Sequence, residues 1–328
     1  MTQASLRVED LSIEFHHHRG NLQAIHKVSL ELRSGEILGV VGESGAGKSL
    51  TGSAITGLLA PPGHIVGGDI SYNGRSLLNM AYGERQKLRG KEIAAIFQDP
   101  LTSLNPVLTI GDQLVETIQT HLPIGKKEAH NRAVKILKDV GIPAAEQRMA
   151  HFPHQFSGGM RQRVVIALAL CVDPKVVIAD EPTTALDVSV QAQILKLLRD
   201  LCSRNQTAIM LVTHDMGVVA EVCDRVAVLY AGHLVESGDV KQILKNPRHP
   251  YTKGLMDSIP KIGVRQEKLF QIPGSMPRLN ALPPGCKFNP RCPYATDTCL
   301  REVPPSETTH TGHIACWNPL DGGENDNA

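Results

Sequence analysis

The stretch that decides the fold of this chain is Gly42-Glu43-Ser44-Gly45-Ala46-Gly47-Lys48-Ser49. It matches the pattern G-x-x-x-x-G-K-[ST] of the phosphate-binding P-loop. Residues 36–41 before it predict a buried strand, and residues 48–59 after it predict a helix. Glycines let the backbone turn its N–H groups inward, and the helix start adds positive potential. We therefore expect Lys48 to contact the β- and γ-phosphates of a nucleotide and Ser49 to bind Mg²⁺.

The composition indicates a folded protein without a strong overall field. Of the 328 residues, 41% are hydrophobic and 20% are charged, which allows one large domain or two modest ones. A net charge of +1 favours neither nucleic acid nor anionic lipid as a partner. The first five residues lack the layout of a signal peptide, and the longest apolar run, residues 164–172, is too short to span a membrane. We expect a cytoplasmic chain that reaches a membrane only through partners.

The N-terminal segment predicts two antiparallel strands beside the nucleotide core. Apolar residues alternate over residues 6–15 and again over 24–32, as in half-buried strands. His16-His17-His18 lies between them; a solvated loop is favoured over a metal site, because adjacent side chains point in different directions. Phe15 fits either the core or a position stacked on a base.

The segment after the P-loop helix continues the α/β pattern. The expected elements are a turn at residues 61–63, a strand at 68–74, a short helix at 84–88 and a strand at 92–97. The last strand ends at Gln98, a polar residue suited to contact Mg²⁺ or an attacking water.

Residues 99–155 predict a helical insertion. A loop at residues 99–106 precedes two helices, at 109–120 and 127–140. The second helix carries one apolar stripe, which fits a core face better than a cofactor face. The stripe consists of Ala133, Ile136, Leu137 and Val140.

Ser157-Gly158-Gly159 precedes an apolar helix at residues 164–171. A hydroxyl, exposed N–H groups and the helix dipole together can bind a γ-phosphate. The stretch alone favours a simpler role, in which Ser157 caps the helix.

Two further strands end in chemically active residues. Residues 175–181 predict a buried strand ending in Asp180 and Glu181, and burying two acids is costly unless they meet a metal or a water. Asp180 fits Mg²⁺ binding and Glu181 fits a base that orients the attacking water. Capping the next helix is the alternative role, but Asp187 already fits that position. The strand at residues 208–213 ends at His214, so four predicted strands end beside one expected ligand edge.

In this order, the motifs over residues 5–260 resemble those of an ATP-binding-cassette (ABC) ATPase. The resemblance makes residues 42–49 the Walker A loop, Gln98 the Q-loop, and Asp180-Glu181 the end of Walker B. Residues 156–160 resemble the signature motif, Ala185-Leu186-Asp187 the D-loop, His214 the switch histidine and Phe15 the adenine-stacking position. The implied fold is a P-loop NTPase with a RecA-like core, an antiparallel β subdomain and a helical subdomain at about 99–163. We expect the ATP-binding domain to cover residues 1–259 and a Cys-rich extension to cover 260–328.

The signature core Ser157-Gly158-Gly159 is intact, although Phe156 and Met160 replace the commonest Leu and Gln. The family implies two cassettes that close head to tail around two ATP molecules, each held between one Walker A and the partner's signature. Closure and hydrolysis then drive membrane subunits. With Glu181 and His214 both present, we expect a hydrolytically competent site.

The C-terminal extension points to a metal group. It is rich in proline yet contains four of the seven cysteines, at positions 286, 292, 299 and 316. A disulfide framework is improbable without a signal peptide, so Cys286, Cys292, Cys299 and Cys316 fit metal binding better. Their spacing lacks the close pair common in zinc sites and suits a [4Fe–4S] cluster, with Zn²⁺ left as the alternative. The remaining cysteines, Cys171, Cys202 and Cys223, fit packing positions.

Residues 246–252 and 289–294 are similar to the C-terminal extension of the D-type ATPase of dipeptide and oligopeptide importers, which implies the [4Fe–4S] cluster. The resemblance also implies a second, homologous ATPase as heterodimer partner, two transmembrane permeases, docked at residues 99–112, and an extracytoplasmic peptide-binding protein. The chain would then lie on the cytoplasmic face of the bacterial inner membrane. Dipeptide is the first cargo expected, with oligopeptide, glutathione and nickel importers left open. A nucleic-acid-processing ABC ATPase is the alternative, but no basic insertion or second cassette is present, so we expect no nucleic acid.

Overall fold

The computed structural model describes residues 4–17, 20–183, 186–259, 270–309 and 312–320. Its contacts divide the chain into two compact units. The first, unit 1, comprises Met1–Leu6, Leu32–Ile37 and Tyr72–Leu211. The second, unit 2, comprises Arg7–Glu31, Leu38–Ser71 and Val212–Ala328.

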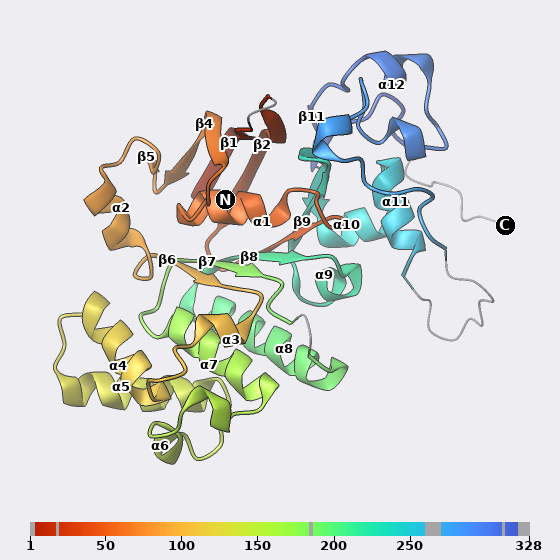
Figure 1. The fold of residues 1–328 in the computed structure, drawn as a ribbon. Helices are drawn as coiled ribbons and strands as arrows, with labels where there is room; N and C mark the ends of the chain where they lie inside the picture. Colours follow the sequence, from red (N-terminus) through yellow and green to blue (C-terminus); the bar gives the residue numbers. More distant parts are fainter. Residues whose placement is uncertain (1–3, 18–19, 184–185, 260–269, 310–311, 321–328) are drawn as a thin grey trace. The chain divides into compact units, whose positions relative to one another are not determined.

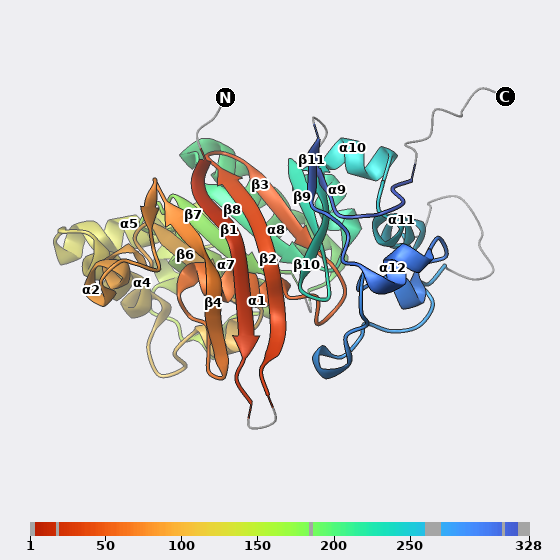
Figure 2. The same cartoon turned by 90° about the horizontal axis from the view of Figure 1, so that it is seen from above.

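Three long strands of unit 2 form one sheet in the order β2-β1-β4 (Figure 2). They are β1 (Ala4–Phe15), β2 (Leu22–Arg33) and β4 (Gly63–Tyr72). Apolar residues that alternate along the sequence are buried here, among them Leu11, Ile13 and Val28. Because β1 and β2 are hydrogen-bonded neighbours joined by a short loop, they run in opposite directions, as predicted.

Strand β4 begins at Gly63, five residues before the predicted start. The strand continues through Gly68, whose φ of +83° is a left-handed conformation. A Cβ at Gly68 would collide with the carbonyl oxygens of Glu9 and Asp10 on β1. This glycine therefore permits a close approach of two strands inside the sheet rather than marking a strand boundary.

The second sheet of unit 2 has the order β11-β12-β10-β9-β3. Its strands are β3 (Ile37–Val41), β9 (Arg225–Tyr230), β10 (His233–Asp239), β11 (Glu307–Thr309) and β12 (Gly312–Ile314). Strand β3 is buried throughout and pairs in parallel with β9, while β10 pairs antiparallel with β9 and β12. The helices of this unit outside its C-terminal region are α1 (Lys48–Thr56), α9 (Met216–Val222), α10 (Val240–Lys245) and α11 (Pro250–Asp257).

The helices in the described part of the C-terminal region are all short, as its proline content predicts. They are η2 (Leu279–Ala281), η3 (Asn289–Arg291) and α12 (Asp297–Arg301). The sequence did not predict its strands. Strand β12 adds to the edge of β10, where Ile314 faces Glu236 and His313 faces Ser237. The region is therefore joined by a backbone ladder to the sheet that carries β3.

The strands of unit 1 have the order β8-β7-β6. They are β6 (Ile93–Ile96), β7 (Val176–Asp180) and β8 (Ala208–Thr213), whose first four residues belong to this unit; β5 (Arg75–Ser76) is a short strand apart from them. All three are almost fully buried, which explains their continuous apolar runs. Strands β6 and β7 pair in parallel, with Ile96 opposite Ala179.

Helices make up most of the rest of unit 1. They are α2 (Tyr82–Leu88), α3 (Pro100–Ser103), α4 (Ile110–His121), α5 (Lys126–Asp139), α6 (Ala145–Arg148), η1 (Pro153–Gln155), α7 (Gly158–Leu170) and α8 (Val188–Asn205). Helices α4, α5 and α7 contact one another (Figure 1). The predicted stripe that begins at Ala133 is buried, so it is core. Helix α3 lies in the predicted loop, because Asp99 caps it and Pro100 suits its first turn.

Three cysteines occupy packing positions, as predicted: Cys171, Cys202 and Cys223 are all buried. No helix among the described residues is both long and apolar enough to cross a membrane.

Candidate functional site

The phosphate loop of unit 2 joins the buried strand β3 to α1, the context that the motif requires. Gly42 and Gly47 have φ values of +153° and +103°. A Cβ at Gly42 would collide with the carbonyl oxygen of Leu229, and one at Gly47 with the side chain of Ile25. Only glycine combines this backbone path with such close approach, so the loop geometry depends on both positions.

The Lys48 side chain is held over the loop. It is buried, and its ammonium donates hydrogen bonds to the carbonyl oxygens of Gly42 and Glu43, at 2.8 and 3.0 Å. The backbone N–H of Glu43 donates to the hydroxyl of Tyr251, at 2.9 Å. This loop is thus fixed from within by Lys48 and from α11 by a buried tyrosine.

Two other predicted residues of unit 2 lie at or just after the end of a strand. Phe15 is the last residue of β1 and is half-buried. His214 follows β8 and is exposed, next to Asp215, which caps α9. In the predicted histidine cluster, His16 and His17 are exposed, and His16 stacks on His64 with ring centroids 4.2 Å apart. His18 lies outside the described residues.

Unit 1 brings Gln98 and Glu181 together. Ile96 of β6 pairs with Ala179 of β7. Gln98 and Glu181 each follow their paired residue by two positions, so both lie at the same edge of the sheet. The Gln98 amide donates to a carboxylate oxygen of Glu181 at 3.0 Å. Asp180, the last residue of β7, directly precedes Glu181 and is half-buried. Glu181 has a φ of +45°, an unusual left-handed conformation that no sequence pattern predicted and that is typical of functional sites.

Ser157 caps α7, as its sequence context predicts: its hydroxyl accepts the Met160 N–H at 3.4 Å. Ser157 and Gly158 are exposed at this helix start. A Cβ on Gly159 would lie 2.8 Å from the Val190 side chain, so the glycine lets α7 approach α8.

Asp187 caps α8, as expected. Its carboxylate accepts the N–H of Val190 and the hydroxyl of Ser189, and the Val190 hydrogen bond is the main reason that its pKa is lowered. Ala185 of the same predicted motif lies outside the described residues. The start of α7 and the capped start of α8 therefore meet within unit 1.

The four C-terminal cysteines lie within electrostatic reach of one another. Burial, with a smaller contribution from the charges of Cys286, Cys292 and Cys299, raises the pKa of Cys316 to about 11. Burial also raises the pKa of Cys286 and of Cys292. The backbone N–H of Cys286 donates to the carbonyl of Cys299 at 2.9 Å. In the described part of the chain, no three His, Cys, Asp or Glu side chains are placed to hold one metal ion.

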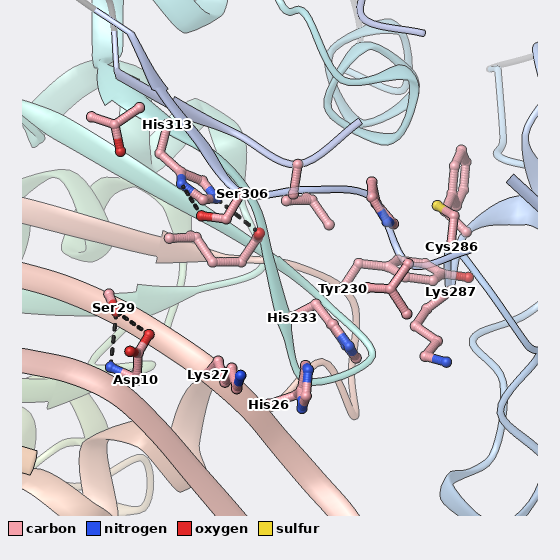
Figure 3. Close-up of a pocket in the computed structure, with 17 residues that line it drawn as sticks. Asp10, His26, Lys27, Ser29, Tyr230, His233, Cys286, Lys287, Ser306 and His313 are labelled. Atoms are coloured by element: carbon pink, nitrogen blue, oxygen red, sulfur yellow. Dashed lines mark hydrogen bonds between the residues drawn. The ribbon is translucent and has the colours of Figure 1, made fainter. Parts of the chain in front are cut away.

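A cavity of about 480 Å³ lies in unit 2, between β2, β10 and the C-terminal region (Figure 3). Its lining includes His26, His233, Lys27 and Lys287. The rings of His26 and His233 are 4.9 Å apart, and burial lowers the pKa of His233 to about 4. The Tyr230 and Phe288 rings form part of the wall.

Sequence reasoning gave no role to three residues around the phosphate loop: Tyr230, Tyr251 and Arg291. Arg291 donates to both carboxylate oxygens of Glu43, at 3.0 and 3.1 Å. These partners are 248 residues apart in the chain, so no local pattern could have linked them.

Comparison with known proteins agrees with this geometry. Residues 25–184 match the family model described as ABC transporter, and residues 235–299 match the oligopeptide/dipeptide transporter C-terminal region. The oligopeptide transport ATP-binding protein OppD of Escherichia coli is 48% identical over 97% of this chain and 94% of its own length. OppD of Bacillus subtilis is 50% identical over 95% and 88%, and the E. coli dipeptide transport protein DppD is 44% identical over 97% and 98%.

Among solved structures, the dimeric post-hydrolysis state of the ATP-binding cassette MJ0796, bound to ADP and Pi, superposes with a TM-score of 0.65 at 26% identity. The superposition covers 72% of this chain and 98% of that one. The predicted P-loop, ABC-type fold is confirmed. The chain therefore belongs to the ABC transporter family, as an ABC-type ATPase that carries the oligopeptide/dipeptide transporter C-terminal region.

Proposed function

We propose that this chain is the ATP-hydrolysing subunit that powers import of peptides through an ABC transporter. The observation that carries the proposal is the match to transport ATP-binding proteins for oligopeptides and dipeptides. That match runs through both the cassette and the C-terminal region, over 97% of the chain. A nucleic-acid-processing ATPase would not need this C-terminal region.

The side chains supply the parts that phosphoryl transfer to water requires. Lys48 and the N–H groups of the phosphate loop hold the triphosphate, and Phe15 stacks on the adenine. Ser49, Asp180 and Gln98 offer the oxygen donors that Mg²⁺ prefers, and the ion would neutralise phosphate charge. Glu181 orients the attacking water while Gln98 holds its carboxylate, and His214 contacts the γ-phosphate.

The exposed helix start at Ser157 and Gly158 serves the nucleotide of a partner cassette. In this arrangement a second, homologous ATPase subunit completes each ATP site, and Asp187 lies at the same subunit contact. The dimeric structure of the ATP-binding cassette MJ0796 is a precedent for paired cassettes.

The hydrolytic assignment is tested by Glu181→Gln in the assembled transporter. This variant should bind ATP with wild-type affinity or tighter, while its turnover falls at least about 100-fold, because the water loses its base. Glu146→Gln, which alters an exposed glutamate of α6 in the same unit, should keep wild-type turnover. Near-normal turnover of Glu181→Gln would refute the assignment.

The four cysteines are proposed to hold a [4Fe–4S] cluster with a structural role. The proposal rests on backbone N–H groups directed at sulfur and on the electrostatic influence of three of the thiols on Cys316, although no three of the described side chains are placed to hold one metal ion. Phe288 and Asn289 donate to Cys286, Tyr294 donates to Cys292, and Asn318 donates to Cys316. Thiolates bound to iron accept such hydrogen bonds. Zn²⁺ is the alternative occupant.

Anaerobic purification followed by iron, sulfide and zinc analysis decides the occupant. About four irons and four sulfides per chain, with a broad absorption band, support the cluster. One zinc per chain without iron would replace the cluster by a zinc site. If the protein contains neither iron nor zinc, the metal proposal is refuted.

The partners proposed are two transmembrane permeases, which dock at the loop of residues 99–112, and an extracytoplasmic peptide-binding protein. The chain would lie on the cytoplasmic face of the membrane as a peripheral subunit. Uptake of dialanine and of longer alanine peptides, compared in cells with and without this chain, tests the cargo. Uptake that does not depend on the chain for any of these peptides would contradict peptide import.

A further inference from the structure

A buried arginine of the C-terminal region is bonded to the phosphate loop. Arg291 is the last residue of η3 and directly precedes Cys292. Its side chain is 6% exposed, and its Nη1 lies 3.0 and 3.1 Å from the two carboxylate oxygens of Glu43. Glu43 is the second residue of the phosphate loop. The loop thus carries a negative charge whose compensation comes from outside the loop.

The arginine is held in place from several sides. Its Nε donates to the carbonyl of Pro273 at 2.8 Å, and its Nη2 to the carbonyl of Ile272 at 3.4 Å. Nη1 also donates to the Tyr230 hydroxyl at 3.3 Å. The guanidinium carbon lies 5.8 Å from the Tyr230 ring centroid and 5.9 Å from that of Phe288. Such a planar, multiply bonded guanidinium loses little further freedom when it binds a carboxylate.

Glu43 links this arginine to the lysine that serves the phosphates. Its carbonyl oxygen accepts the Lys48 ammonium at 3.0 Å and the Ala46 N–H at 3.1 Å. The backbone N–H of Glu43 donates to the Tyr251 hydroxyl. The Glu43 backbone is therefore part of the loop's curvature, while its side chain is fixed by Arg291.

The ion pair between Arg291 and Glu43 also changes the charge that the phosphate loop presents to a nucleotide. An unpaired carboxylate in a phosphate-binding loop would repel the several negative charges of a triphosphate. With Arg291 in place, the Glu43 charge is neutralised where the nucleotide is expected.

We propose that Arg291 is a positioning residue for nucleotide binding: the C-terminal region neutralises and fixes Glu43 so that the phosphate loop accepts ATP. The inference rests on the proposed ATP role of this loop. It gives the C-terminal region a task in the ATP cycle that is separate from cargo and from the identity of any bound metal.

The test measures KM for ATP and kcat in the assembled transporter for a set of charge variants. In Arg291→Gln, KM should rise about tenfold, the change expected from losing one charge-assisted interaction, while kcat falls less than twofold. The rise should shrink at high salt, because screening weakens the repulsion. Arg291→Lys keeps the charge and should raise KM less than Arg291→Gln.

Removing the repelling charge should reverse the defect. Glu43→Gln alone should lower KM severalfold, because the Arg291 charge is then uncompensated near the phosphates. The double variant Arg291→Gln/Glu43→Gln should return KM to within about threefold of wild type, which a merely structural role of Arg291 does not predict. The matched control is Arg301→Gln, which breaks an exposed ion pair with Asp297 in the same region and should leave both constants unchanged.

The outcomes separate the two proposals. If wild-type protein neither binds nor hydrolyses ATP, the proposed function fails. If it does, a wild-type KM in Arg291→Gln, or a double variant as weak as Arg291→Gln, overturns the positioning role alone. Should Arg291→Gln not fold, a raised KM in Glu43→Gln would overturn it equally.

Discussion

His249 makes the stability of unit 2 depend on pH in a way that can be calculated. It is fully buried and caps α11, where its Nδ1 accepts the Tyr251 N–H at 3.0 Å. Its Nε2 is buried and has no hydrogen-bond partner among the described residues. The neutral ring fits this site and the charged ring does not, so burial lowers the pKa from 6.5 to about 3.

The sign follows from proton uptake. Between pH 6.5 and about 3 the unfolded chain binds a proton at this position and the folded chain does not, so acid favours unfolding. The His249 contribution is complete above pH 6.5 and is lost progressively as the pH falls. Between pH 7.5 and 5.5 the loss is about 1.4 kcal/mol in unfolding free energy.

The variant His249→Asn isolates this contribution, because asparagine can cap the helix and does not titrate. Lost packing on Phe288 lowers its stability by a constant amount at every pH. Glu236, whose pKa burial raises, and the other buried histidines titrate in both proteins. Their effects therefore cancel in the difference between wild type and variant.

The assay is denaturant unfolding at pH 7.5 and 5.5, with hydrogen exchange of the α11 amides as a local measure. Wild type should lose about 1.4 kcal/mol more than His249→Asn over this interval. Equal losses in the two proteins would refute the assignment of a buried neutral histidine.

Three further predictions concern single contacts. Gly42→Ala should abolish ATP binding, measured by equilibrium titration, because its Cβ would collide with the carbonyl oxygen of Leu229. The control Gly83→Ala, on the exposed helix α2, should bind ATP normally. Normal binding by Gly42→Ala would contradict the loop geometry. Leu137→Ala, at a fully buried position of α5, should cost about 2–5 kcal/mol in urea unfolding, whereas a cost below about 1 kcal/mol would argue against its core position. Thr109→Ala removes the hydroxyl that accepts the Asp112 N–H at the start of α4 and should cost about 1 kcal/mol in the same assay; no loss would show that the cap is dispensable.

Much of the nucleotide half of the site was predictable because its signals are local. The glycines of residues 42–47, the buried run of β3 and the caps at Ser157 and Asp187 each act over a few residues. Element boundaries were less predictable. Helix α7 begins at Gly158 rather than at the apolar residue 164, because a capped start needs no apolar residue.

Contacts between distant segments were not predictable in the same way. The hydrogen bond between Gln98 and Glu181 requires the register of β6 on β7, and sequence patterns predict strands without fixing which residues pair. The strands of the C-terminal region were missed for a related reason: β12 is only three residues long and forms on the exposed edge of β10.

The sequence by itself determined the P-loop and the α/β core with its helical insertion, and it predicted the residues that are proposed to hold ATP. These features depend on periodicity and on backbone chemistry that each residue carries with it. Only the tertiary structure decided that Arg291 neutralises Glu43, across 248 residues, and that Tyr251 holds the same loop. The physical reason is that an ion pair depends on where folding places two charges, and that placement comes from the packing of the whole unit.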